Sequence, residues 1–247
     1  MKTISRQLLF GAGLIALSVA VYLLHYAIFG DARNIFYYMI MDIAFMFIQV
    51  LIVTVILNEL LVMREKKAML QKLNMVIGAF FSEVGTELLK NLSKFQPEPG
   101  PLSKGLMVDG NWPDEKFLSA RAALKQIDIK MDAGLGDLNV LRDMLVGERG
   151  FLLGLLENQN LLEHASFTDL LWAVFHLTEE LSSRNGFEGL PAADLDHLSG
   201  DIKRAYVLLV SEWVAYMNHL KNNYPYLFSL AVRKNPFNPD ASPVISK

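Results

Sequence analysis

The chain has 247 residues, of which 52% are hydrophobic and 20% are charged, with a mean hydropathy of +0.28. This composition is too apolar for an intrinsically disordered chain, and the net charge of −3 gives no basic footprint of the kind that binds nucleic acid. The sequence contains no cysteine, so disulfides, thiolate zinc sites and cysteine nucleophiles are excluded.

Two apolar segments near the N-terminus predict membrane spans. Residues 8–29 contain no charged side chain, and residues 35–58 contain only Asp42. Each segment is long enough to cross a hydrocarbon core of ~30 Å as a helix. Residues 1–63 are therefore expected to form a two-helix transmembrane hairpin with a tight turn at residues 30–34. The first segment is longer than the ~7–15 apolar residues of a signal peptide, and a second span follows it.

The basic residues predict the orientation of this hairpin. Lys2 and Arg6 precede the first span, and four basic residues between positions 64 and 72 follow the second span. The turn holds only Arg33. Because basic loops stay in the cytoplasm, we expect both termini there. The expected location is a plasma or inner membrane, with the lipid bilayer as the first partner.

Small and polar residues in the spans form stripes on the helix faces. One stripe of small residues at a spacing of four favours close helix contact, and therefore a homo-oligomer. It consists of Ala12, Ala16 and Ala20. A second stripe repeats at a spacing of seven in the same helix. It consists of Gly11, Ser18 and His25.

Asp42 and Gln49 share one face of the second span, because they are seven residues apart. A carboxylate inside a membrane usually faces a protein interior or a water-filled cavity, so one interpretation is a pore lined by these two side chains. The other interpretation, which we favour, is that Asp42 lies near the interface and pairs with His25 or Tyr22 of its own hairpin. The short turn leaves no room for a filter loop of the potassium-channel type.

A long helix is predicted to continue from the second span. Residues 64–77 contain no glycine or proline, and apolar residues recur at spacings of three and four from residue 70 to residue 92. This pattern predicts an amphipathic, stalk-like exit helix over residues 64–95. It forms either a parallel coiled coil or a packing face for later helices. Phe80 and Phe81 are bulky for a tight coiled coil and favour the second interpretation.

The rest of the chain predicts a linker, a helical domain and a tail. Residues 96–113 hold four prolines and three glycines and are predicted to be a linker. Residues 114–232 are predicted to form a cytoplasmic, bundle-like helical domain, with Ser166 as one N-cap. Its expected helices are residues 116–132, 138–156, 166–184, 191–223 and 226–232. Residues 233–247 are expected to be an extended tail.

The sequence contains no recognisable catalytic motif. The glycine patterns of dinucleotide-binding and phosphate-binding loops are absent, and so is the Gly-x-Ser-x-Gly elbow. We therefore expect no catalytic residue, no cofactor and no enzymatic activity.

The histidines after the two apolar segments are the candidate metal ligands in this sequence. His176 precedes Glu179 and Glu180 by three and four residues, so these carboxylates lie on its helix face. The Glu-x-x-His pairs of ferritin-like di-metal sites are absent. The favoured prediction is that no metal is bound. The alternative is a site made by His164, His176 and Glu179.

Taken together, these patterns predict an all-α protein made of a transmembrane hairpin, a long exit helix and a cytoplasmic helical domain. The expected function is that of a non-enzymatic, membrane-anchored and self-associating scaffold or signalling module, which presents its helical domain to a cytoplasmic protein partner. The alternative is a small homo-oligomeric ion channel, in which the second span lines the pore with Asp42 and Gln49.

Overall fold

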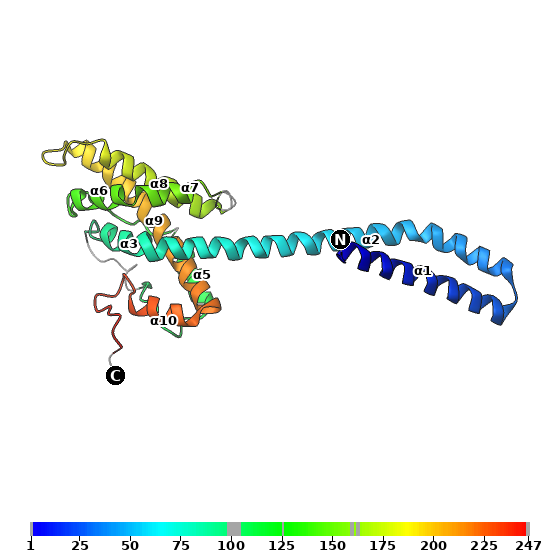
Figure 1. The fold of residues 1–247 in the computed structure, drawn as a ribbon. Helices are drawn as coiled ribbons and strands as arrows, with labels where there is room; N and C mark the ends of the chain where they lie inside the picture. The colour runs from blue at the N-terminus through cyan, green and yellow to red at the C-terminus, as the bar shows by residue number, and fades with distance from the viewer. Residues whose placement is uncertain (1, 98–104, 125, 159–160, 162–163, 246–247) are drawn as a thin grey trace. The chain divides into compact units, whose positions relative to one another are not determined.

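The computed structural model describes residues 2–97, 105–124, 126–158, 161 and 164–245. The described residues contain helices and no β-strand, which confirms the predicted all-α class (Figure 1). The helices are α1 (Lys2–Phe29), α2 (Ala32–Phe80), α3 (Thr86–Ser93), α5 (Asp114–Leu124), α6 (Leu138–Gly147), α7 (Arg149–Leu156), α8 (Ala165–Ser182), α9 (Ala192–Asn223) and α10 (Pro225–Arg233), with a π-helical turn η1 (Phe81–Gly85) between α2 and α3.

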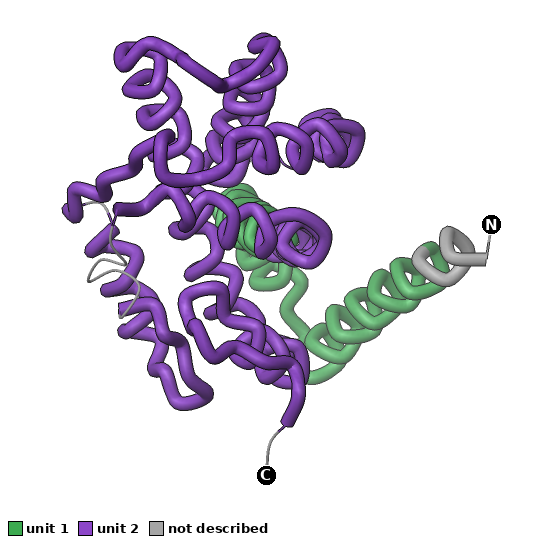
Figure 2. The backbone as a smooth tube through the Cα atoms, turned by 90° about the vertical axis from the view of Figure 1, so that its left-hand side faces the viewer, with its two compact units in different colours: residues 1–66 green, residues 67–247 purple. Residues whose placement is uncertain are grey.

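The chain divides into two compact units, which Figure 2 shows in separate colours. Residues 1–66 make the N-terminal unit, which holds α1 and most of α2. Residues 67–247 make the C-terminal unit, which holds the end of α2 and all later elements.

In the N-terminal unit, only Gly30 and Asp31 separate α1 from α2. Gly30 has a φ of +65°, a conformation that favours glycine and ends α1. The Asp31 carboxylate accepts a hydrogen bond of 2.9 Å from the backbone N–H of Arg33, which caps the start of α2. The turn is therefore shorter than the five residues expected. Both helices are long and apolar enough to cross a membrane.

Helical backbone continues without a break from α2 through η1 to the end of α3. At η1, the Thr86 hydroxyl donates a hydrogen bond of 2.7 Å to the backbone carbonyl of Phe81. The Phe80 ring lies 5.3 Å from that of Phe167 on α8, and the Phe81 ring stacks at 4.9 Å on Tyr216 of α9. The apolar stripe of this helical segment thus packs against later helices of the C-terminal unit.

Residues 105–113, expected to belong to a linker, contribute to the core instead. Leu106, Val108 and Trp112 are buried, because the segment packs with the C-terminal unit. The buried Asn235 side chain donates a hydrogen bond of 3.0 Å to the Leu106 carbonyl, which ties this segment to the tail. In the tail, Phe237 packs edge-on against Trp213 at 5.0 Å. Residues 98–104 of the expected linker lie outside the described residues.

Some helix boundaries differ from the predicted ones for local reasons. Helix α5 ends at Leu124, because residues 126–133 turn to bury Ile129 and Ala133. The helix expected over residues 138–156 is divided at Glu148 into α6 and α7. The N-cap of α8 is His164 instead of Ser166, since the His164 ring accepts a hydrogen bond from the backbone N–H of Phe167.

Helix α9 is the central element of the C-terminal unit, because it packs against α3, α5, α8 and α10. Helices α8 and α9 follow each other in the chain and are joined by residues 183–191, where Gly189 has a φ of +69°. This short connection brings the last turns of α8 beside the first turns of α9 (Figure 1).

Candidate functional site

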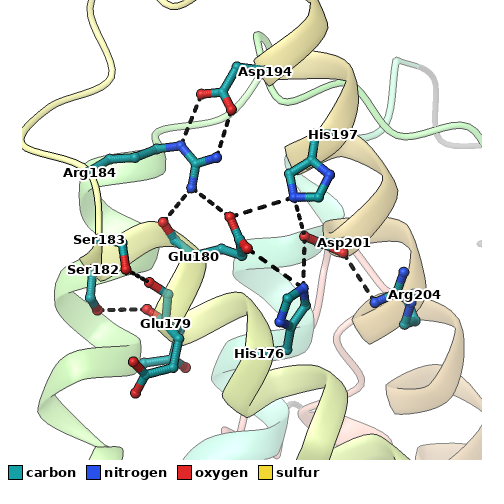
Figure 3. A network of polar contacts seen from close by, with 11 residues as sticks. His176, Glu179, Glu180, Ser182, Ser183, Arg184, Asp194, His197, Asp201 and Arg204 are labelled. Atoms are coloured by element: carbon teal, nitrogen blue, oxygen red, sulfur yellow. Dashed lines mark hydrogen bonds and ion pairs between the residues drawn. The ribbon is translucent and has the colours of Figure 1, made fainter.

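A cluster of histidine and acidic side chains lies along one edge of the α8–α9 contact. Helix α8 buries Leu177 and Leu181, and helix α9 buries Leu198 and Ile202. Each of these four buried residues directly follows a histidine or an acidic residue in the sequence. We call these four histidine and acidic residues the histidine–carboxylate cluster, which consists of His176, Glu180, His197 and Asp201 (Figure 3).

The cluster is assembled from the same spacing on both helices. His176 and Glu180 are four residues apart on α8, and His197 and Asp201 are four residues apart on α9. Residues at this spacing lie one above the other on a helix face. Because the two helices pack together along these faces, two imidazoles meet two carboxylates.

The distances in the cluster are short. The Nε2 atom of His176 lies 3.4 Å from Asp201 Oδ2 and 3.9 Å from Glu180 Oε1. The Nε2 atom of His197 lies 3.3 Å from Asp201 Oδ2 and 3.5 Å from Glu180 Oε2. One ligand atom each from His176, Glu180 and Asp201 lies within 4.8 Å of the other two, which is a suitable spacing for a shared metal ion.

Asp201 is the buried floor of the cluster. Its side chain is only 3% exposed, whereas the His176 and His197 side chains are 45% and 51% exposed. Arg204 binds one carboxylate oxygen, with its Nη1 atom 3.2 Å from Oδ1. The other oxygen, Oδ2, is buried and receives no hydrogen bond from any described residue. Buried carboxylate oxygens normally accept a hydrogen bond or bind a cation, and the two imidazoles near Oδ2 do not provide a hydrogen bond.

Arg184 holds the adjoining carboxylates in place. Its guanidinium forms two hydrogen bonds to Asp194, of 2.9 and 2.7 Å, and one of 2.9 Å to Glu180. These hydrogen bonds hold the pKa values of Glu180 and Asp194 below their ordinary values, because the carboxylate forms are stabilised. The same contacts raise the pKa of the Arg184 guanidinium. Both carboxylates are therefore ionised at neutral pH.

The network has an excess of negative charge. Three carboxylates, those of Glu180, Asp194 and Asp201, face the two guanidinium groups of Arg184 and Arg204. These five groups, counted without the imidazoles, carry a net charge of −1. A cation is therefore the kind of ligand that this arrangement attracts.

The structure does not bring together the three residues of the predicted alternative metal site. His176 belongs to the cluster, but His164 caps the other end of α8. Glu179 points away from the cluster (Figure 3). It pairs instead with Arg149 of α7 at 2.7 Å. His197 and Asp201 are absent from the predicted set. The signal for them is a His-x-x-x-Asp pair at the start of α9, which repeats the His-x-x-x-Glu spacing of α8.

Of the three polar residues predicted in the N-terminal unit, two lie close together and the third lies apart. His25 and Asp42 line one hollow of ≈ 290 Å³ between α1 and α2, together with Tyr22 and Tyr38. The His25 Nδ1 atom is buried there without a hydrogen-bond partner among the described residues. Gln49 is exposed and does not line the hollow.

The predicted alanine stripe on α1 is exposed. Ala12, Ala16 and Ala20 are all exposed, so α2 does not cover them. At ~100° per residue they lie on a different face of α1 from Tyr22 and His25, which face the hollow.

Comparison with known proteins places both units in one family. Residues 2–61 match a family described as the N-terminal helical domain of MJ1433, and residues 69–233 match one described as the C-terminal helical domain of the uncharacterized protein MJ1433. The protein named "Uncharacterized protein MJ1433" from Methanocaldococcus jannaschii is 46% identical to this chain over 224 residues, which is 91% of this chain and 90% of that protein. No solved structure matches the chain. The chain therefore belongs to the MJ1433 family.

Proposed function

We propose that this protein is a membrane-anchored, self-associating module that holds a cytoplasmic helical domain at the bilayer for a protein partner. The observation that supports it most is the exposure of the apolar N-terminal unit. Between Leu8 and Met63, many large hydrophobic residues are exposed. Their exposed fractions range from 41% to 78%. A water-soluble protein buries such a surface, whereas lipid tails solvate it.

The lengths of the two apolar segments fit this anchor. Residues 8–29 and 35–58 span ~33 and ~36 Å as helices, enough to cross the hydrocarbon core. The distribution of basic residues favours a hairpin with its turn outside and both chain ends in the cytoplasm. The C-terminal unit, with its own buried core, would then lie in the cytoplasm.

Self-association is assigned to the alanine stripe on α1. Small residues at a spacing of four allow helix backbones to approach closely in lipid. Because Ala12, Ala16 and Ala20 lie away from the face that meets α2, they are free to contact α1 of a second copy.

The module is proposed to be non-enzymatic, and two exposed aromatic side chains support the proposal of a protein partner. Trp172 on α8 is 57% exposed, and Tyr226 on α10 is 71% exposed. Exposed aromatic residues are common anchors of protein interfaces.

The experiment that tests the anchor uses single cysteines, because the chain has none of its own. Three variants are made in the full chain: Ala32→Cys at the first residue of α2, next to the turn, Val53→Cys within the second span, and Ser242→Cys in the tail. Intact cells or spheroplasts are labelled with a membrane-impermeant maleimide before and after permeabilisation. The proposal predicts labelling of Ala32→Cys from outside, of Ser242→Cys only after permeabilisation, and of Val53→Cys in neither case.

Two outcomes would overturn the anchor. If all three cysteines are labelled equally and the chain stays in the soluble fraction, the apolar helices do not enter the bilayer. If Ser242→Cys is labelled from outside and Ala32→Cys is not, the helices cross the membrane in the opposite direction.

The second candidate function is a small homo-oligomeric channel lined by α2. It is favoured by the exposure of Asp42 and Gln49 on α2. Asp42 also shares its hollow with His25 and Tyr22, which favours local pairing in one hairpin over a ring of carboxylates. In a planar bilayer, Asp42→Asn would abolish or alter cation conductance if the channel function is correct. If the scaffold function is correct, the wild-type protein shows no conductance and Asp42→Asn leaves self-association unchanged.

A further inference from the structure

The distances between the ligand atoms of the histidine–carboxylate cluster match those around a four-coordinate metal ion. A tetrahedral Zn²⁺ site with bonds of ~2.0–2.1 Å separates neighbouring ligand atoms by ~3.3–3.4 Å. Three of the nitrogen–oxygen distances in the cluster are 3.3, 3.4 and 3.5 Å, and the fourth is 3.9 Å. The ligand atoms of His176, Glu180 and Asp201 are thus close enough together to share one ion, and His197 lies beside them, near the same two carboxylates.

We propose that the cluster binds one divalent transition-metal ion, with Zn²⁺ as the best match, through His176, Glu180 and Asp201, and with His197 as the fourth ligand. The ion would join α8 to α9, since each helix supplies one imidazole and one carboxylate.

The buried oxygen of Asp201 argues for a metal instead of simple ion pairs. An ion pair with a protonated histidine would normally place an N–H on the carboxylate oxygen. Although both Nε2 atoms lie within 3.4 Å of Asp201 Oδ2, neither donates a hydrogen bond to it. A buried carboxylate oxygen that accepts no hydrogen bond is costly, and a metal ion between this oxygen and the two imidazole nitrogens would satisfy it.

The neighbouring arginines fix the ligands in the manner of outer-shell groups in metal sites. Arg204 binds Asp201 Oδ1 and leaves Oδ2 directed at the two imidazoles (Figure 3). Arg184 binds Glu180 Oε2 and is itself held by Asp194. Such contacts orient the ligating carboxylates.

The exposure of the cluster provides a path for the ion. The buried carboxylate forms the floor, and the half-exposed imidazoles form the mouth. Exposed side chains can turn towards an ion without moving the helices that carry them.

The chemistry of the donors selects the class of metal. Two imidazole nitrogens and two carboxylate oxygens suit Zn²⁺ and its neighbours among the divalent transition metals. Ca²⁺ and Mg²⁺ prefer sites made of oxygen atoms alone, so excess Mg²⁺ should not displace Zn²⁺.

The test uses the full chain, purified in detergent without a histidine tag and stripped of metal with a chelator. Zn²⁺ binding is measured by isothermal titration calorimetry, and Co²⁺ is used as a visible probe of four-coordinate geometry. His176→Gln and Glu180→Gln remove ligands. The matched controls are His219→Gln, a histidine outside the cluster, and Glu179→Gln, the neighbouring carboxylate that pairs with Arg149.

The proposal predicts one Zn²⁺ per chain, a rise in melting temperature on binding, and an intense visible spectrum with Co²⁺. It predicts at least tenfold weaker Zn²⁺ binding in both ligand variants and unchanged binding in both controls. Equal Zn²⁺ binding by the wild type and the ligand variants would overturn it. If circular dichroism shows that a ligand variant is unfolded, the test rests on the wild-type protein alone. A Co²⁺ spectrum of the wild type that is the same as that of the ion in buffer would then overturn the proposal.

Discussion

Glu212 of α9 is buried beside Arg121 of α5, with the Arg121 Nη2 atom 3.3 Å from Glu212 Oε1. The Glu212 side chain is only 2% exposed, whereas that of Arg121 is 37% exposed. Arg121 also donates a hydrogen bond of 3.2 Å to Ser211, so one guanidinium fastens α5 to two adjacent residues of α9.

Replacing Arg121 with methionine should destabilise the C-terminal unit. The change keeps an apolar side chain of similar length but leaves the Glu212 carboxylate buried without its charge partner. We expect a loss of about 2 kcal/mol in the free energy of unfolding, measured by urea titration in detergent. The control is Lys90→Met, which breaks the exposed ion pair with Glu87 and should change the same quantity by less than ~0.5 kcal/mol. Equal effects of the two variants would show that the buried pair is not important for stability.

Two glycines on the same continuous helical segment should respond in opposite ways to alanine. A Cβ atom at Gly85 would lie 2.7 Å from the rings of Phe80 and Phe81, both of which are buried, so Gly85→Ala should destabilise by about 1–3 kcal/mol. A Cβ atom at Gly78 would meet Tyr216 at an ordinary 3.6 Å, and Gly78→Ala should stabilise by about 0.5–1 kcal/mol. Thermal melts of the two variants give the comparison, and a stable Gly85→Ala protein would be evidence against the tight π-helical turn.

The contacts of Arg184 predict a dependence of stability on pH. Its hydrogen bonds lower the folded-state pKa values of Glu180 and Asp194 below the ordinary values of 4.5 and 3.8. A carboxylate with a lowered pKa contributes stability above its unfolded pKa and loses that contribution as the pH falls through the folded pKa. The melting temperature of the metal-free protein should therefore fall below about pH 4.

Arg184→Gln isolates this contribution. The variant should melt at a lower temperature than the wild type at pH 6, and the difference should shrink as the pH falls below about 4.5 and passes through the lowered pKa values of the two carboxylates. A difference between the two proteins that is independent of pH would mean that Arg184 acts through packing and not through these two carboxylates.

The alanine stripe on α1 should lie at a contact between copies. A cysteine at Ala16 should form an intermolecular disulfide under mild oxidation in the membrane, because small-residue faces bring helix backbones close together. A cysteine at Leu14, on the opposite face of α1, should cross-link much less. Non-reducing gels measure both, and equal cross-linking of the two variants would place the contact elsewhere.

Hydrophobic periodicity predicted the all-α class and most of the helices, because helix-forming patterns depend on neighbours in the sequence. The bulky side chains of Phe80 and Phe81 also predicted that this stripe packs on later helices, since large aromatic residues are too bulky for a tight coiled coil. Proline and glycine content was misleading for residues 105–113. The buried Leu106, Val108 and Trp112 show that an irregular segment can still supply core side chains.

Only the α8 half of the histidine–carboxylate cluster could be predicted from the sequence. The spacing of His176 and Glu180 places both on one helix face, and this much follows from local geometry. Their partners His197 and Asp201 come from the next helix, and their approach depends on how α8 and α9 pack. Glu179 satisfied the spacing equally well, and only the tertiary contact with Arg149 excludes it from the cluster.

Native mass spectrometry of the full chain, released from lipid nanodiscs, tests the proposed membrane-anchored scaffold most directly, because it gives the number of copies and any bound lipid in one spectrum. We expect a dimer that carries lipid and is joined through α1. A closed ring of four or more copies would contradict the scaffold and favour a pore lined by Asp42, since two hairpins cannot enclose a water path. A lipid-free monomer would contradict both the anchor and the self-association.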